Sequence, residues 1–172
     1  IQDEQFPFDP ASIDAVVLSH AHLDHSGLLP RLRHEGFSGP VICTRATAEL
    51  LEIMLNDSVG LYLRDLERTN VRNARQGRPL LDPIYTMDDV EAVLKQCDGH
   101  RYRESVPLGE SASVCFYDAG HILGSSIVEI TLREHNEEKV LVFSGDLGKA
   151  DSALMNEPTS LTRADLLLVE ST

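Results

Sequence analysis

The sequence predicts a mixed α/β domain built in layers. Short apolar runs lie near both ends of the chain, the stretch between them has helical periodicity, and polar residues follow each apolar run at once. Strands at both ends, with helices between and behind them, favour layers over a doubly wound parallel sheet. The chain has 172 residues, 42% of them hydrophobic and 25% charged, so we assign residues 1–172 to one globular domain.

The first half of the chain is predicted to be one strand followed by helices. The apolar run at residues 15–18 has the length of a buried strand. Helices are expected over three stretches, residues 26–35, 47–75 and 86–96. The second is expected to break near Gly60. In the third, Thr86 is placed to cap the N-terminus and Asp89 to reach back to it.

The second half is predicted to be mostly strands. Three apolar runs predict strands buried on at least one face, at residues 114–117, 140–143 and 166–169. Apolar and polar residues alternate from Ser126 to Arg133, which predicts a half-buried strand. The polar run at 134–138 then predicts a hairpin turn. Because polar residues follow the strands, their ends are expected to form one shared rim.

The formal charge of −13 argues against a general attraction to nucleic acid, since that attraction comes from Lys and Arg displacing counterions. Any nucleic-acid role therefore needs a local site. Five arginines recur at helical spacing and predict either a solvated helix face or a phosphate-contacting stripe: Arg64, Arg68, Arg72, Arg75 and Arg78.

No apolar run is long enough to span a bilayer, and the N-terminus lacks the pattern of a secretion signal, so we expect a cytoplasmic protein that does not enter the membrane. Cys43, Cys97 and Cys115 are odd in number and widely spaced. They predict reduced, buried thiols rather than a disulfide framework or a thiolate zinc site.

The stretch with the clearest chemistry places His20, His22, Asp24 and His25 within six residues, between the first strand and the first helix. Imidazole nitrogen and carboxylate oxygen suit zinc, with manganese or iron as substitutes. The alternative is a solvated histidine-rich turn. Because no tag or biased tract surrounds it, we interpret this turn as a metal site.

Two later residues are predicted to complete the site. His121 and Asp146 each stand just past a strand end, and a second metal needs more ligands than one short turn supplies. Gly120, Gly124 and Gly145 lie beside them, where glycine allows close approach or left-handed backbone. His34, His100 and His135 lie in polar or turn contexts and are expected at the surface.

The HxHxDH pattern from His20 to His25 resembles the signature of the metallo-β-lactamase superfamily. Residues 118–125 and 143–148 resemble its third and fourth motifs. The resemblance implies an αββα layered sandwich that holds two zinc ions. It also implies that His20, His22 and His121 hold one metal, that Asp24 and His25 hold the other, and that Asp146 bridges them.

The long, largely helical segment before His121 and the strand that ends in Glu170 resemble the β-CASP group of RNA-processing enzymes. In that group an acidic residue at this place helps to deliver a proton to the leaving group. Relative to the group's pattern, the N-terminal strands, the β-CASP insertion and a final metal-binding histidine are missing. We therefore interpret the chain as a fragment.

The predicted function is metal-dependent cleavage of RNA phosphodiesters, with Asp24, Asp146 and Glu170 as the catalytic carboxylates and RNA as the partner. One alternative is a hydrolase of small esters, thioesters or lactones, because the metal site alone does not choose the substrate. The other is a non-catalytic scaffold that keeps the fold without the metals.

Overall fold

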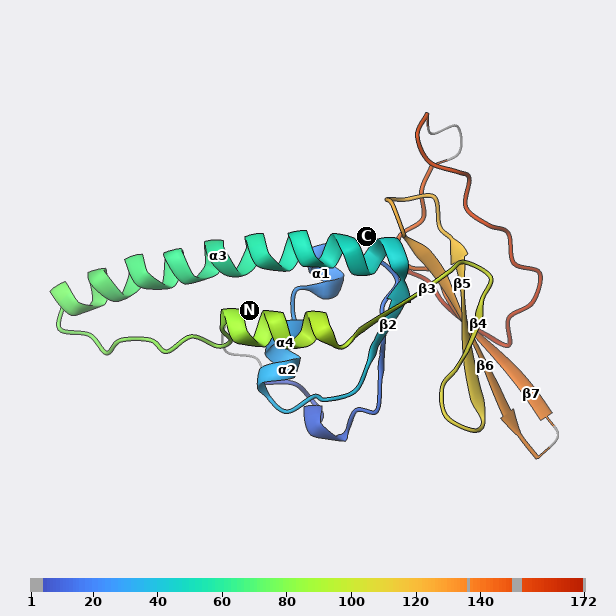
Figure 1. Ribbon diagram of the computed structural model, residues 1–172, viewed down its shortest axis with the longest axis horizontal. Helices are drawn as coiled ribbons and strands as arrows, with labels where there is room; N and C mark the ends of the chain where they lie inside the picture. Colours follow the sequence, from blue (N-terminus) through green and yellow to red (C-terminus); the bar gives the residue numbers. More distant parts are fainter. Residues whose placement is uncertain (1–4, 136, 150–152, 172) are drawn as a thin grey trace.

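The computed structural model describes residues 5–135, 137–149 and 153–171, which form two β-sheets with helices on one side (Figure 1). The first sheet is parallel, with strand order β1-β2-β3, and its strands are β1 (Val16–Val17), β2 (Val41–Thr44) and β3 (Cys97–His100). The second sheet has the order β4-β5-β6-β7-β8 and is antiparallel except for the β7–β8 pair. Its strands are β4 (Ser105–Pro107), β5 (Ala112–Asp118), β6 (Ser126–Glu134), β7 (Glu137–Phe143) and β8 (Leu166–Leu168).

Four α-helices and a short 3-10 helix come from the first part of the chain. They are η1 (Pro10–Ser12), α1 (Leu23–Ser26), α2 (Leu29–His34), α3 (Arg45–Arg75) and α4 (Met87–Lys95). α3 runs alongside α4, and its far end projects well away from both sheets (Figure 1). No helix in the described part of the chain is both long and apolar enough to cross a membrane.

Two apolar cores hold the layers together. Leu51, Leu55 and Val59 of α3 pack against α4 and the helix side of the first sheet, and all three are fully buried. On its other side, the first sheet contributes Ile42 to a second core, which Phe116 of β5 also enters. Because side chains alternate along a strand, the neighbours of Phe116 point to the outer face of the second sheet. The observed layers are therefore helix, sheet and sheet.

The helices differ from the expected ones in two places. The helix predicted at residues 26–35 is observed as the shorter α2, with Pro30 in its first turn, and the separate helix α1 ends at Ser26 before it. The expected break near Gly60 is wrong, because α3 continues through it and its buried face spans that position. A helical glycine costs only about 1 kcal/mol relative to alanine, too little to end a well-packed helix.

α4 and the β6–β7 hairpin agree with the sequence. The capping box predicted at Thr86 is present, with the Thr86 N–H donating to Asp89 Oδ2 at 2.8 Å. The hairpin turn is tighter than expected, because Glu134 pairs with Glu137. Asn136, within the predicted turn, lies outside the described residues.

The strand predictions were wrong in other respects. β2, β3 and β4 were not predicted. The strand at residues 166–169 was expected to be buried on one face, but Leu166, Leu167 and Leu168 of β8 are 53%, 55% and 47% exposed. β8 pairs with β7 at an edge of the sheet, and no described segment lies over it closely enough to bury these leucines.

Candidate metal centre

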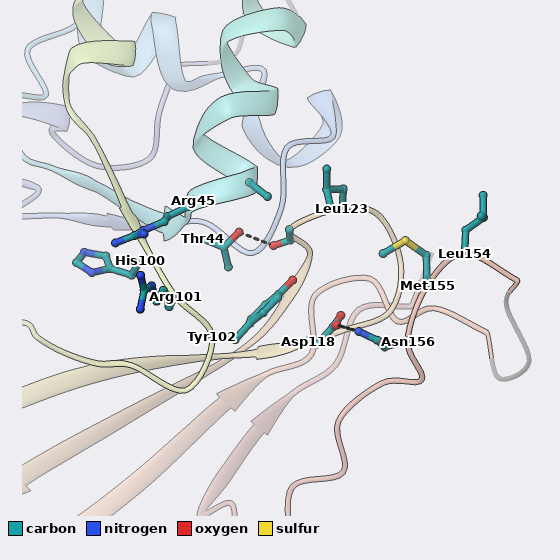
Figure 2. Close-up of a pocket in the computed structure, with 12 residues that line it drawn as sticks. Thr44, Arg45, His100, Arg101, Tyr102, Asp118, Leu123, Leu154, Met155 and Asn156 are labelled. Carbon is teal, nitrogen blue, oxygen red and sulfur yellow. Dashed lines mark hydrogen bonds between the residues drawn. The ribbon is translucent and has the colours of Figure 1, made fainter.

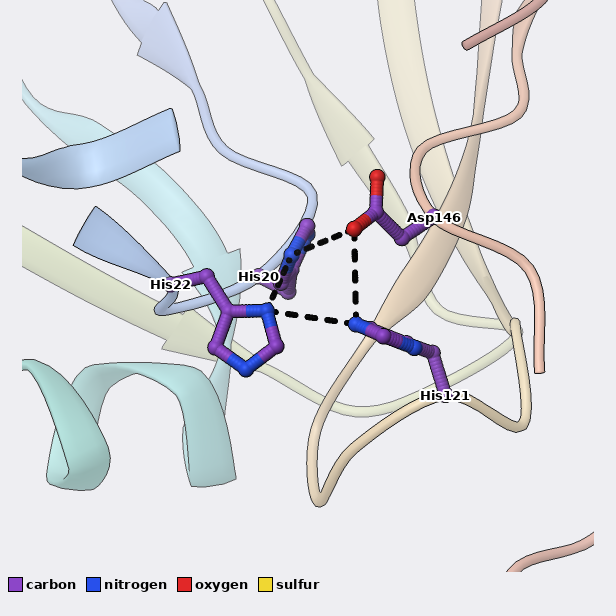
Figure 3. Close-up of side chains that lie close together, drawn as sticks. All are labelled: His20, His22, His121 and Asp146. Atoms are coloured by element: carbon purple, nitrogen blue, oxygen red, sulfur yellow. Dashed lines mark hydrogen bonds and ion pairs between the residues drawn. The ribbon is translucent and has the colours of Figure 1, made fainter. Parts of the chain in front are cut away.

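The predicted site residues follow strands at one edge of the two sheets, in loops or, for Asp24 and His25, in the short helix α1. His20, His22 and His25 follow β1 of the first sheet. His121 follows β5 and Asp146 follows β7 of the second sheet. Figure 3 shows His20, His22, His121 and Asp146 pointing toward a common centre. The packing of the two sheets thus brings together residues that are far apart in the sequence.

The first group contains three imidazoles and one carboxylate. His22 Nδ1 lies 3.2 Å from both His20 Nε2 and His121 Nε2. The fourth potential ligand atom, Asp146 Oδ2, lies 3.6 Å from His20 Nε2 and 3.4 Å from His121 Nε2. One ligand atom from each of the four residues lies within 4.8 Å of the others. This set of N and O donors suits a divalent transition metal.

A second group shares Asp146 with the first. His25, Asp146 and Glu170 each place one ligand atom within 4.8 Å of the other two, and His25 Nε2 lies 3.3 Å from Asp146 Oδ1. The two oxygens of Asp146 therefore face different groups. Asp24 belongs to neither: its carboxylate is 68% exposed and lies 3.6 Å from His25 Nε2.

Two observations indicate that these residues fit a bound cation. The three imidazole nitrogens of the first group converge at hydrogen-bonding distance, where a cation can accept all three lone pairs at once. Asp146 Oδ1 is buried and accepts no hydrogen bond within the described residues. A buried carboxylate oxygen is costly without a partner, and a bound cation would supply one.

His20 is held in the neutral form that binds metals. Burial lowers its pKa to about 4, and the neighbouring His25, His22 and His121 contribute to the lowering, against the opposing effect of Asp146. Its ring is fully buried, and Ser19 Oγ lies 3.0 Å from Nδ1. In the tautomer whose Nδ1–H donates to Ser19 Oγ, the Nε2 lone pair faces the group.

Three serines that hold the site were missed by the sequence analysis. Ser19 orients His20, and its carbonyl accepts hydrogen bonds from both the N–H and the hydroxyl of Ser126. Ser125 Oγ accepts hydrogen bonds from the backbone N–H groups of His121 and Ile122. These serines are buried and lie close to the histidine motifs in the sequence. That proximity is the one signal that could have found them.

The glycines near the ligands adopt the backbone that was predicted for them. Gly120, Gly124 and Gly145 have φ values of +66°, +80° and +53°. Gly124 shows why glycine is needed: a Cβ there would lie 2.6 Å from the backbone nitrogen of Thr47. Its carbonyl accepts hydrogen bonds from the hydroxyls of Thr44 and Thr47, at 2.7 and 2.9 Å. The loop that carries His121 is thereby fixed to the start of α3.

The other histidines lie outside both groups. His34 is 47% exposed and pairs with Asp89, and His135 is 90% exposed. His100 differs from the expectation of a surface residue, because only 16% of its side chain is exposed and it lies between Asp98 and Glu104. None of the three joins a described group that could hold a metal.

Two packed sheets backed by helices, with a His/Asp cluster at their common edge, define a mixed α/β protein of the metallo-β-lactamase fold. The chain belongs to the beta-lactamase superfamily: the family described as "Beta-lactamase superfamily domain" matches residues 2–172. The family membership expected from the HxHxDH motif is confirmed.

The curated relatives of this chain include a ribonuclease and a transcription termination factor. The chain is 38% identical over 167 residues to Ribonuclease TTHA0252 of Thermus thermophilus, covering 97% of this chain and 33% of that protein. It is 30% identical over 179 residues to Transcription termination factor FttA of Methanocaldococcus jannaschii, covering 99% of this chain and 26% of that protein. The chain thus spans a quarter to a third of the length of these relatives.

Among solved structures, BJP-1, a subclass B3 metallo-beta-lactamase of Bradyrhizobium japonicum, matches with a TM-score of 0.54 and 19% sequence identity. The match covers 94% of this chain and 58% of that one. At this identity the likeness shows a shared fold and does not extend to the substrate.

Proposed function

We propose that the protein carrying this chain is a metal-dependent ribonuclease of the β-CASP group that cleaves RNA phosphodiester bonds. The convergence of His20, His22 and His121 on Asp146 carries the proposal, because it forms a site for a divalent cation. The similarity to Ribonuclease TTHA0252 supports RNA as the substrate. We assign two zinc ions to the site, with manganese or iron as substitutes.

In this proposal each side chain has a distinct role. His20, His22 and His121 would hold one cation, His25 and Asp24 would hold the other, and both would share Asp146. Two cations in such a site supply hydroxide at neutral pH and stabilise the charge on the scissile phosphate. The exposed Asp24 carboxylate already lies 3.6 Å from His25 Nε2, beside the second group.

We propose that Glu170 helps to deliver a proton to the leaving oxygen. Its carboxylate groups with His25 and Asp146, and its backbone N–H donates to Ser144 Oγ at 3.0 Å. This hydrogen bond fixes the end of β8 at the edge of the site. Glu170 therefore lies close enough to act on the reacting groups, or to bind the cation beside His25.

The proposal also accounts for the acidity of the chain. A formal charge of −13 repels RNA at long range. Two divalent cations would place four positive charges where the scissile phosphate binds, while Asp146 and Asp24 would face the metals rather than the substrate. A cytoplasmic location and a single domain over residues 1–172 stay predictions.

The test uses the whole protein that carries this chain, with Asp146→Asn as the variant and Asp57→Asn as its control. Asp57 is exposed on α3, so both substitutions remove one negative charge. Elemental mass spectrometry is expected to find bound zinc, manganese or iron. Labelled single-stranded RNA should be cleaved, and Asp146→Asn should slow that cleavage by about a hundredfold or more.

The same assays distinguish the alternatives. Hydrolysis of a thioester without RNA cleavage would contradict the proposal and favour the small-ester hydrolase. Purified protein without bound metal would favour the non-catalytic scaffold. Equal RNA cleavage by Asp146→Asn and Asp57→Asn would show that Asp146 has no role in the reaction.

A further inference from the structure

A cavity of about 410 Å³ is lined in part by the loop that carries His121, and Figure 2 shows Leu123 of that loop at the cavity. Leu123 and Gly124 of that loop form one wall. Since two residues of extended chain span at most about 7 Å, this wall lies within that distance of His121. The cavity is therefore close enough to contact a strand whose scissile bond lies at the metals.

The topology places the cavity along the same edge of the first sheet. β1, β2 and β3 are parallel, so the chain leaves all three strands at one edge. β1 leads to the metal-binding turn, β2 leads to Arg45 and β3 leads to Arg101. With strands about 4.8 Å apart, the end of β3 lies about 10 Å from the end of β1.

One side of the cavity carries basic side chains, with the carboxylates of Asp98 and Glu104 next to them. Arg45, His100 and Arg101 gather there in Figure 2. His100 lies between two carboxylates, with Asp98 Oδ2 at 3.0 Å from Nε2 and Glu104 Oε1 at 3.6 Å from Nδ1. Neither arginine forms an ion pair with any residue that the structure describes. Both guanidinium groups are thus available to an anionic ligand.

The acidic residue in the wall does not compete for those arginines. Asp118 Oδ1 accepts a hydrogen bond from the Gly120 N–H, and Oδ2 accepts one from Asn156 Nδ2, both at 2.8 Å. Both oxygens are therefore used by protein donors, and they hold the segment around Asn156 against the cavity.

The opposite side is apolar and partly aromatic. Tyr102 is fixed by its hydroxyl, which donates to the Ser125 carbonyl at 2.8 Å. Leu123 and Leu154 also line the cavity although they are 62% and 94% exposed. Exposed leucines beside a fixed aromatic ring offer a surface on which a base can stack.

We propose that this cavity binds one nucleotide of the RNA strand, with its phosphodiester held by Arg45 and Arg101 and its base against Tyr102 and Leu123. The inference rests on the ribonuclease function proposed above and names the residues that attract RNA to an acidic protein. Arginine is suited to this role because its planar guanidinium can donate two hydrogen bonds to one phosphate.

The test measures the binding of a labelled single-stranded RNA to the whole protein by fluorescence anisotropy, over a range of salt concentrations. The variant is the double substitution Arg45→Gln and Arg101→Gln. The control is Lys95→Gln with Lys139→Gln, which removes the same charge from exposed positions that do not line the cavity. Thermal unfolding and metal content, expected to match the unsubstituted protein, establish that the variants are folded.

The cavity variant should bind the RNA about tenfold more weakly, and its plot of log affinity against log salt should be less steep by about 0.7 for each phosphate that the protein no longer binds. The control should bind as the unsubstituted protein does. Equal binding by the cavity variant, or a greater weakening in the lysine control, would overturn the inference. Both results can be read without any cleavage, so a failure of the ribonuclease proposal would be seen separately.

Discussion

Replacing Gly124 with alanine should destabilise the protein by about 3 kcal/mol. Its φ of +80° costs an L-residue about 1 to 2 kcal/mol. The added Cβ would lie 2.6 Å from the backbone nitrogen of Thr47 and 2.9 Å from the hydroxyls of Thr44 and Thr47. To relieve these clashes the loop must move away from α3, which breaks both hydrogen bonds to the Gly124 carbonyl.

Each of those hydrogen bonds contributes about 1 kcal/mol. Alanine also stiffens the unfolded chain, which offsets up to about 1 kcal/mol and brings the net destabilisation to the stated value. Urea unfolding followed by far-UV circular dichroism, with a chelator present, measures this change without any contribution from bound metal.

Gly60→Ala is the matched control. Gly60 lies inside α3, and a Cβ there meets no heavy atom within 4 Å. This substitution should therefore stabilise the protein by about 0.5 to 1 kcal/mol. The reasoning would be refuted if Gly124→Ala unfolded at the same urea concentration as the unsubstituted protein, or if Gly60→Ala were the more damaging change.

Two further predictions concern titratable groups. Burial tends to raise the pKa of Asp89, but hydrogen bonds from the Thr86 N–H and hydroxyl, and from His34, outweigh it and lower that pKa below its usual value. The carboxylate therefore contributes fully to the free energy of unfolding above its ordinary pKa, and this contribution is lost as the pH falls through the lowered pKa. Asp89→Asn should lower the free energy of unfolding in urea by about 1 kcal/mol at neutral pH and by little in strong acid. A loss of stability that does not depend on pH would contradict this prediction. Burial raises the pKa of the Cys43 thiol to about 12, so a thiol reagent at neutral pH should label Cys43 only after the protein unfolds. Mass spectrometry locates the label, and rapid labelling of Cys43 in the native protein would contradict its burial.

The site could be anticipated because its chemistry is concentrated in short segments. His20, His22 and His25 lie within one turn, and Gly120 and Gly145 mark where the backbone must take positive φ near the other candidates. Such signals are local and need no knowledge of packing. The grouping of Glu170 with His25 was not anticipated, because it depends on how β8 aligns with β7.

The missed strands depend on pairing that the local sequence does not encode. β3 reads Cys-Asp-Gly-His, which has no apolar alternation, and it is a strand because it pairs with the fully buried β2. Gly99 eases the close approach of β3 to α3, since a Cβ would lie 3.1 Å from the Cα of Arg45. Gly60 shows the opposite case. Glycine weakens a helix locally, but α3 continues through Gly60 because the leucines and the valine near it are buried.

The first ligand group draws His20 and His22 from one sheet and His121 and Asp146 from the other. An ion bound there would cross-link two layers that are also joined by an apolar core and by the hydrogen bonds from Ser126 to the Ser19 carbonyl. Its affinity would exist only after the layers have docked, so metal uptake would report on tertiary assembly rather than on secondary structure. In the cell, metal supply would then influence how long newly made protein survives proteolysis, as well as how much of it is active.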